Sequence, residues 1–81
     1  MDIYVGNIPY SLTEEELREI FEAHGEVASA RIIKDRETGR SKGFGFVNMP
    51  ENDEAEVAIK EMNGNEFKGR PLRVNEARGR D

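Results

Sequence analysis

The chain has 81 residues, of which 36% are hydrophobic and 36% charged, and its formal net charge is −5 at pH 7. This length allows one small core and excludes a second domain, and the absence of cysteine excludes disulfides and thiolate metal sites. No apolar run reaches the roughly 20 residues of a membrane helix and the N-terminus lacks the features of a signal peptide. We therefore expect a cytoplasmic protein, or a nuclear one in a eukaryote, with no membrane partner.

The first predicted elements are a strand and a helix. Residues 3–8 alternate apolar side chains with other residues and stop at Pro9, a pattern typical of a short strand. Thr13 suits a helix N-cap because Glu16, three residues later, completes a capping box. The apolar positions that follow have helical spacing, and Gly25 is expected to end the helix in a left-handed conformation. The pattern predicts a helix over residues 14–24.

The second half of the chain continues with strands and one more helix. Two runs rich in β-branched residues, at 27–34 and 42–49, are separated by the polar segment DRETGRS and predict an antiparallel hairpin. Asn52 is expected to cap a second helix that ends near residue 63, and residues 72–77 predict a last strand. The order βαββαβ predicts an α+β fold of the ferredoxin-like, split βαβ type. In this fold two helices cover one face of a four-stranded antiparallel sheet.

Side-chain alternation leaves aromatic residues on the face of the sheet that the helices do not cover. Along residues 42–49 the even positions include Phe44 and Phe46, whereas the odd positions are small or apolar and suit the core. Two glycines among the odd positions are expected to let a helix approach closely. The same alternation turns Tyr4 outward. Flat rings grouped on a solvated sheet mark a binding surface and suit stacked bases.

Two segments of the chain carry a family resemblance. IYVGNI at residues 3–8 and KGFGFVNM at residues 42–49 resemble the two signature segments of the RNA recognition motif (RRM) family. They follow the family's order, with the predicted elements between them. Met49 departs from the family pattern, which more often has an aromatic residue there, and alternation places it in the core. The resemblance implies an RRM over residues 1–78, followed by a short basic and acidic tail, 79–81.

The resemblance also implies roles for individual residues. The two signature strands would be neighbours, with Tyr4 beside Phe46. Tyr4 and Phe46 would stack successive bases, Phe44 would pack against sugars, and Lys42 would pair with a phosphate. The implied partner is single-stranded RNA, with no cofactor, no metal and no catalytic residue.

Further candidate contacts flank the aromatic residues. Alternation turns Arg31 and Ile33 of one outer strand, and Arg73 and Asn75 of the other, toward the same face. An ordinary solvated sheet face explains Arg31, Ile33 and Asn75 equally well, and Arg73 less well. Asn7 serves either a turn or a base edge, with the turn favoured, and Arg78 is close enough to the last strand to reach a phosphate. The predicted RNA-binding residues are Tyr4, Phe44, Phe46, Lys42, Asn7, Asn48, Arg31, Ile33, Arg40, Arg73, Asn75 and Arg78.

The charges are segregated along the chain. The predicted helical stretches hold eleven acidic and two basic residues, a net charge of −9, whereas the rest of the chain carries +4. The basic residues around the predicted hairpin are Lys34, Arg36, Arg40 and Lys42. An acidic helix side would limit nonspecific adhesion to RNA while the hairpin attracts the strand, although helix acids are ordinarily just solvated.

Three other functions are alternatives to the binding of single-stranded RNA. An enzyme is not supported, because the single histidine, His24, has no evident catalytic partner, and GFGF lacks the lysine of a phosphate loop. An RRM that mainly binds protein usually lacks the sheet aromatics that this sequence has. Protein interaction, and binding of single-stranded DNA in addition to RNA, are the alternatives that stay open. We expect a monomer.

Overall fold

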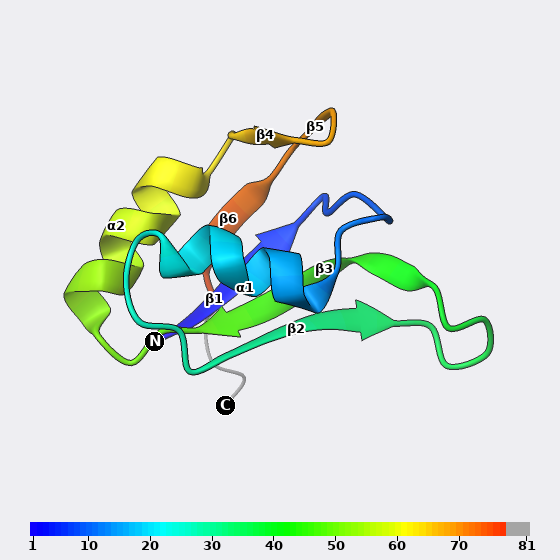
Figure 1. Cartoon of the computed structure of the whole chain (residues 1–81), viewed down its shortest axis with the longest axis horizontal. Coiled ribbons are helices and arrows are strands. Elements are labelled where there is room, and N and C mark those ends of the chain that lie inside the picture. The colour runs from blue at the N-terminus through cyan, green and yellow to red at the C-terminus, as the bar shows by residue number, and fades with distance from the viewer. Residues whose placement is uncertain (78–81) are drawn as a thin grey trace.

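A computed structural model describes residues 1–77 and shows an antiparallel sheet with two helices (Figure 1). The elements are β1 (Asp2–Gly6), α1 (Glu14–Glu22), β2 (Ser29–Lys34), β3 (Ser41–Asn48), α2 (Asn52–Met62), β4 (Glu66–Phe67), β5 (Arg70–Pro71) and β6 (Arg73–Glu76). The main sheet has the order β2-β3-β1-β6, and β4 and β5 form a separate hairpin. The predicted βαββαβ fold is confirmed. The expected domain boundary at residue 78 lies outside the described residues.

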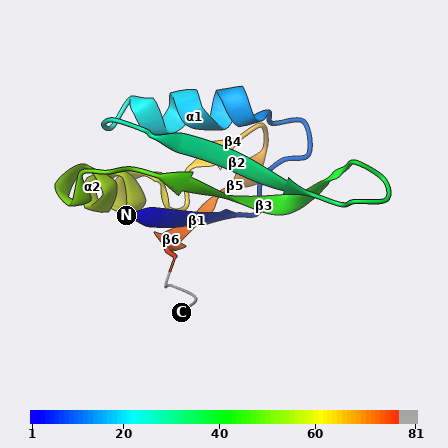
Figure 2. The same ribbon diagram turned by 90° about the horizontal axis from the view of Figure 1, so that it is seen from below.

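The core lies between the sheet and the helices. α1 packs on β2 and α2 packs on β6, and Figure 2 shows α1 above the layer of strands. Ile3, Val5 and Val47 are fully buried, as the alternation along β1 and β3 predicts. Met49 is also fully buried, which confirms its predicted place in the core. The opposite face of the sheet is left for the outward-facing side chains.

Helix α1 begins with the predicted capping box. The Glu16 N–H donates to Thr13 Oγ1 at 3.1 Å, and the Thr13 N–H donates to Glu16 Oε1 at 3.0 Å. The Thr13 N–H, together with the Lys68 ammonium 3.4 Å away, holds the pKa of the Glu16 carboxyl below its ordinary value. The first turn of α1 is therefore fixed by the hydrogen bonds between Thr13 and Glu16 and by the ion pair of Glu16 with Lys68, in the turn between β4 and β5.

Replacing Thr13 with alanine should lower the free energy of unfolding by about 1 kcal/mol, because the Glu16 N–H loses its acceptor. Urea unfolding followed by circular dichroism measures the change. Ser11→Ala, at an exposed loop position outside the capping box, is the matched control and should change stability by less than about 0.5 kcal/mol. Equal losses in both variants would argue against a specific role for the cap.

The prediction that Gly25 ends α1 in a left-handed conformation is wrong. Gly25 does not have a positive φ, and the helix is capped by Ala23, which keeps a right-handed φ of −66°. A side chain at residue 25 is disfavoured for another reason: its Cβ would collide with the Glu54 side chain. The Glu54 carboxylate lies there because it accepts the Glu26 N–H at 2.9 Å.

The N-cap of α2 differs from the prediction by one residue. Asn52 is the first helical residue, and Glu51 is the N-cap, with no hydrogen bond from its side chain. The Glu51 carbonyl accepts the first helical hydrogen bond, from the Ala55 N–H at 2.9 Å. The chain is therefore already turning into the helix before Asn52. At the other end Gly64 has a φ of 88°, which suits its predicted position just past the helix.

The two glycines of β3 meet two different needs, a close approach of the neighbouring strand at Gly45 and a left-handed backbone conformation at Gly43. A Cβ on Gly45 would collide with the backbone carbonyl of Arg31 in β2 and lie 3.0 Å from the Ile32 Cα. Gly43 has a φ of 88°, which an L side chain would strain. The expected reason for the two glycines, a closely approaching helix, is therefore wrong. The close approach is between the backbones of β2 and β3.

The sequence pattern does not predict the β4–β5 hairpin, because each strand has only two residues. Lys68 and Gly69 both have positive φ, as a two-residue hairpin turn requires. Phe67 packs against the core, and the Asn7 amide donates to the Pro71 carbonyl at 2.7 Å. These contacts fix the hairpin against the end of β1.

Each outer strand of the main sheet donates an N–H to a side chain. The Ile32 N–H of β2 donates to the Glu14 carboxylate at 2.9 Å, and the Val74 N–H of β6 donates to the Asn63 amide oxygen at 3.0 Å. β2 and β6 are the two edges of the sheet. At both edges, a side chain from the start or end of a helix occupies a position where a further strand would pair.

Candidate nucleic-acid interface

Three aromatic side chains form one cluster on the open face of the sheet. The register of β1 and β3 pairs Tyr4 with Phe46, as the resemblance implies. The Tyr4 ring centroid lies 5.9 Å from that of Phe46 and 6.1 Å from that of Phe44, and the two phenylalanine centroids are 6.2 Å apart. Tyr4, Phe44 and Phe46 are named the aromatic platform below. Phe46 is 38% exposed, so apolar ring surface is available to a ligand.

Gly6 makes room for the Tyr4 ring. The two residues share the open face, and a Cβ on Gly6 would lie 2.6 Å from the Tyr4 hydroxyl oxygen. The ring therefore extends along β1 over the glycine, where Arg73 of β6 is the paired neighbour. The signal available in the sequence is a glycine two residues after an outward-facing aromatic, which the motif match alone does not reveal.

The flanking strands extend the platform across the sheet. On the β2 side, Arg31 pairs with Phe46. On the β6 side, Asn75 pairs with Tyr4. These four residues and Ile33 line a shallow hollow over the open face. The structure thus brings the predicted outer-strand residues to the two sides of the platform.

The two predicted asparagine contacts have partners within the protein. Asn48 donates to the Asp2 carboxylate at 2.7 Å. Asn7 has a φ of 56°, and its amide donates to the Pro71 carbonyl. The positive φ and the backbone partner favour a turn role for Asn7. The bond from Asn48 places the Asp2 carboxylate at the margin of the open face. Arg78, also predicted as a contact, lies outside the described residues.

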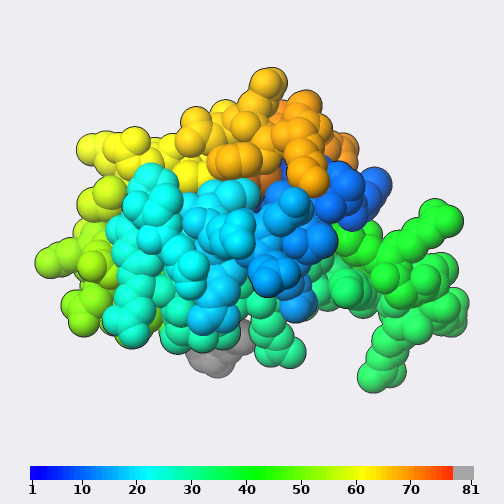
Figure 3. All heavy atoms as spheres, viewed as in Figure 1, coloured from blue at the N-terminus to red at the C-terminus, as the bar shows by residue number. Residues whose placement is uncertain are grey.

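The β2–β3 hairpin carries the exposed basic residues Arg40 and Lys42, and it projects from the body of the molecule (Figure 3). Asp35 organises its turn by accepting the N–H groups of Glu37 at 2.7 Å and Thr38 at 3.2 Å. These two bonds, and the charge of Lys42, hold the pKa of the Asp35 carboxyl below its ordinary value. The positive φ of the next residue after Lys42 interrupts the alternation, so strand parity does not place Lys42 on the open face.

Outside the platform, the single histidine makes a structural contact, and the acidic side chains of residues 1–77 do not gather into a metal site. His24 is half-buried after α1, with its Nε2 3.2 Å from the Met62 sulfur, which is a structural contact. Within residues 1–77, no cluster of three His, Asp or Glu side chains could hold a metal ion. The helices of this part of the chain are too short and polar to cross a membrane.

The family model described as RNA recognition motif matches residues 3–73. The chain belongs to the RRM family. This membership confirms the resemblance of the two signature segments and makes the chain an RNA-binding domain of a family that is not enzymatic.

Three known proteins are similar to this chain in sequence or in fold. The 31 kDa chloroplastic ribonucleoprotein of Nicotiana sylvestris is 50% identical over 78 residues, which cover 96% of this chain and 25% of the relative. The chain therefore spans about a quarter of that protein. The crystal structure of RNA Binding Protein PG1 has a TM-score of 0.94 and 52% identity, and covers 100% of this chain and 98% of PG1. The Sxl-lethal protein in complex with RNA has a TM-score of 0.92 and 33% identity, over 96% of this chain and 47% of that protein.

Proposed function

We propose that this RRM binds single-stranded RNA by stacking bases on the aromatic platform while basic side chains contact phosphates. The observation that carries the proposal is the contiguous cluster of Tyr4, Phe44 and Phe46 on the face that no helix covers. Aromatic rings at this spacing suit successive unstacked bases, because every base has a flat face. The RNA-bound relative of the same fold supports the choice of RNA as ligand.

The basic side chains complete the interface. Arg31 and Arg73 are exposed and lie on opposite sides of the platform: Arg31 pairs with Phe46, and Arg73 pairs with Gly6, over which the Tyr4 ring extends. Arg40 and Lys42 add positive charge on the hairpin, and the acidic residues are concentrated in and around the helices on the other side of the sheet. A strand lying across the platform therefore has cations within reach and is kept away from the helical side.

The expected affinity is modest. Two or three stacked bases contribute about 1 to 3 kcal/mol each, and the cost of association and ordering offsets part of this sum. We expect a micromolar Kd, which corresponds to a binding free energy of about −8 kcal/mol. With about three phosphates neutralised, the slope of log K against log salt should be about −2.

A fluorescence anisotropy titration of a labelled random single-stranded RNA pool tests the proposal. The titration is repeated from about 50 to 200 mM salt, the range over which phosphate contacts lose affinity measurably. Micromolar binding with the expected slope supports the proposal, whereas absence of binding, or an affinity independent of salt, contradicts it. A DNA pool of the same length, run in parallel, shows whether the ligand is RNA or single-stranded nucleic acid in general. The expected monomeric state and cytoplasmic location stay predictions.

A further inference from the structure

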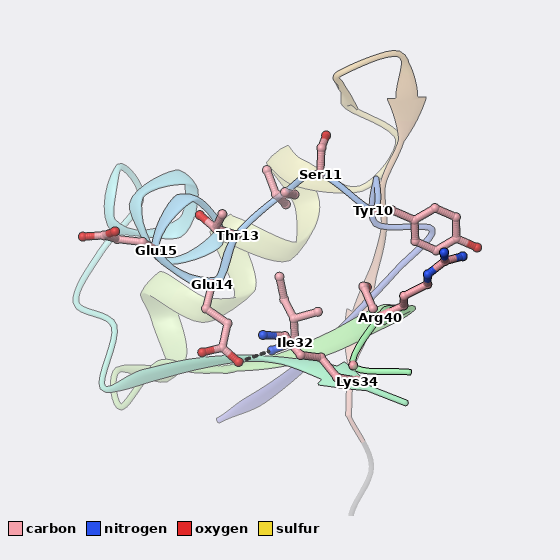
Figure 4. Close-up of a pocket in the computed structure, with 11 residues that line it drawn as sticks. Tyr10, Ser11, Thr13, Glu14, Glu15, Ile32, Lys34 and Arg40 are labelled. Atoms are coloured by element: carbon pink, nitrogen blue, oxygen red, sulfur yellow. Dashed lines mark hydrogen bonds between the residues drawn. The ribbon is translucent and has the colours of Figure 1, made fainter. Parts of the chain in front are cut away.

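The two edges of the main sheet are covered by side chains of different chemistry. At β2, the Ile32 N–H donates to the Glu14 carboxylate at 2.9 Å, the bond drawn in Figure 4. At β6, the Val74 N–H donates to the side-chain amide oxygen of Asn63 at 3.0 Å. A carboxylate is stable beside its own backbone, whereas an asparagine amide can react with the peptide nitrogen that follows it. The side chain that covers β6 is therefore the one with a limited chemical lifetime.

The residue after Asn63 favours this reaction. Asn63 is followed by Gly64, and no other Asn-Gly pair occurs in the sequence, because the other asparagines precede larger residues. Both residues are exposed, so water reaches them. A Cβ added to Gly64 would meet no atom of residues 1–77 within 4 Å, apart from those of its chain neighbours. Neither a side chain nor the surrounding structure therefore hinders attack by the Gly64 nitrogen.

In the folded chain the two reacting groups are held apart. The ψ of Asn63 is 122°, which turns the Gly64 nitrogen away from the Asn63 Cβ, whereas a ring through Cβ and Cγ needs the nitrogen to eclipse Cβ. The Gly64 N–H donates to the Leu72 carbonyl at 2.8 Å, and the Asn63 side chain is directed to Val74. Ring closure therefore requires these two hydrogen bonds to break and the peptide after Asn63 to rotate.

The segment that must open for this rotation is small. It covers residues 64–72, in which β4 and β5 have only two residues each. Phe67 packs against the core, and the Asn7 amide holds the Pro71 carbonyl at 2.7 Å. Short exposed segments with few buried contacts open at a lower cost in free energy than the whole molecule. The reactive conformation is thus accessible from the folded state.

We propose that Asn63 and Gly64 form a self-modification site, at which local opening of residues 64–72 converts Asn63 to isoaspartate and uncovers the edge of β6. The Gly64 nitrogen loses its proton to solvent and attacks Asn63 Cγ. The N–Cγ bond forms, the Cγ–Nδ2 bond breaks, and ammonia leaves with a proton from water. Water then opens the succinimide ring. Cleavage of the new N–Cγ bond gives aspartate, and cleavage of the bond between the Gly64 nitrogen and the main-chain carbonyl carbon gives isoaspartate.

The two products affect β6 differently. Aspartate keeps an oxygen in the position of the amide oxygen, so it still accepts the Val74 N–H. Isoaspartate inserts a methylene group into the main chain and leaves its carboxylate on Cα. The bond of Gly64 to Leu72 and the bond from Val74 then cannot both keep their present geometry. Isoaspartate therefore frees an N–H at the edge of the sheet, where a strand can pair.

Peptide mapping of the full chain tests the reaction. The wild type is incubated at neutral pH and body temperature, folded or in urea, and mass spectrometry with electron-transfer fragmentation separates isoaspartate from aspartate. Isoaspartate should form at Asn63 in the folded protein, at least about tenfold more slowly than in urea, because only the opened segment reacts. Asn65, in the same segment but followed by Glu66, is the internal control and should stay intact. Equal rates in both conditions, or an intact Asn63 in the folded protein after the unfolded chain has reacted many times over, would overturn the proposal.

The Asn7 tether tests whether local opening controls the rate. Asn7→Gly removes the amide that holds Pro71, and glycine adopts the φ of 56° at this position without strain. This variant should form isoaspartate at least about threefold faster, because its segment opens more often. Ser11→Ala, at an exposed position of the same loop, should react at the wild-type rate. An unchanged rate in Asn7→Gly would contradict control by opening of residues 64–72.

Hydrogen exchange tests whether the product uncovers β6. In an aged sample, peptides with isoaspartate and aspartate are separated by chromatography after exchange, so both products are measured together. The Val74 amide should exchange at least about tenfold faster in the isoaspartate form than in the unmodified protein. Asn63→Asp, which keeps an acceptor, should exchange as the wild type does. Equal exchange at Val74 in the isoaspartate and unmodified forms would show that the edge stays covered.

Discussion

Replacing Tyr4, Phe44 and Phe46 together with alanine should weaken binding of single-stranded RNA by at least about 100-fold, to below detection for a micromolar binder. The three rings are mutually in contact, with centroids 5.9 to 6.2 Å apart. Each ring removed takes away a stacking surface worth about 1 to 3 kcal/mol. The basic residues that remain would retain only a weak attraction that falls steeply with salt. Anisotropy titration with the random RNA pool measures the loss.

The triple variant needs evidence that it still folds. None of the three rings belongs to the buried core, so circular dichroism and urea unfolding should show a folded protein. Val57→Ala is the matched control, because Val57 is 51% exposed on α2, on the helical side of the molecule. It should bind RNA as the wild type does. A folded triple variant that binds RNA normally would move the site away from the sheet, and the helical side would become the place to look for a protein partner.

Replacing Gly45 with alanine should lower the free energy of unfolding by about 1 to 3 kcal/mol or more, the range for overpacking in a close-packed interior. The new Cβ would collide with the Arg31 carbonyl and lie 3.0 Å from the Ile32 Cα. Both groups are backbone, so β2 must move away from β3. The urea midpoint should fall, and RNA binding should weaken because Phe44 and Phe46 flank the displaced residue.

Gly6→Ala is the informative counterpart. Its Cβ would meet the end of the Tyr4 side chain, 2.6 Å from the hydroxyl oxygen, and this ring can swing into solvent. The variant should keep most of its stability and lose RNA affinity, because the platform loses one correctly placed ring. If Gly6→Ala were as unstable as Gly45→Ala, the distinction between a backbone and a side-chain collision would be wrong.

Alternation and caps account for the parts of the fold that the sequence predicts. Period-two patterns place Ile3, Val5 and Val47 in the core, and the Thr13 capping box fixes the start of α1. The platform follows from the same alternation, because a buried odd position forces its even neighbours outward. These features depend on near neighbours in the chain, which a sequence displays directly.

The features that the sequence does not predict depend on contacts between distant segments. The sequence predicts that Gly25 ends a helix, whereas in the structure the Glu54 side chain of α2 fills the space that a Cβ at residue 25 would need. The bond between the Asn7 amide and the Pro71 carbonyl likewise requires a two-residue hairpin, which has no periodicity to detect. Short strands and single side-chain approaches become visible only when the loops are placed in space.

The side chains that cover the sheet edges bear on how the protein behaves when concentrated. The Glu14 carboxylate on β2 and the Asn63 amide on β6 each occupy an N–H that would otherwise be free to recruit a strand from a second molecule. An open sheet with an apolar platform would be prone to fibril growth if its edges were also available. The molecule can therefore keep the aromatic platform exposed on the open face, while side chains at the β2 and β6 edges disfavour pairing with a strand of a second molecule.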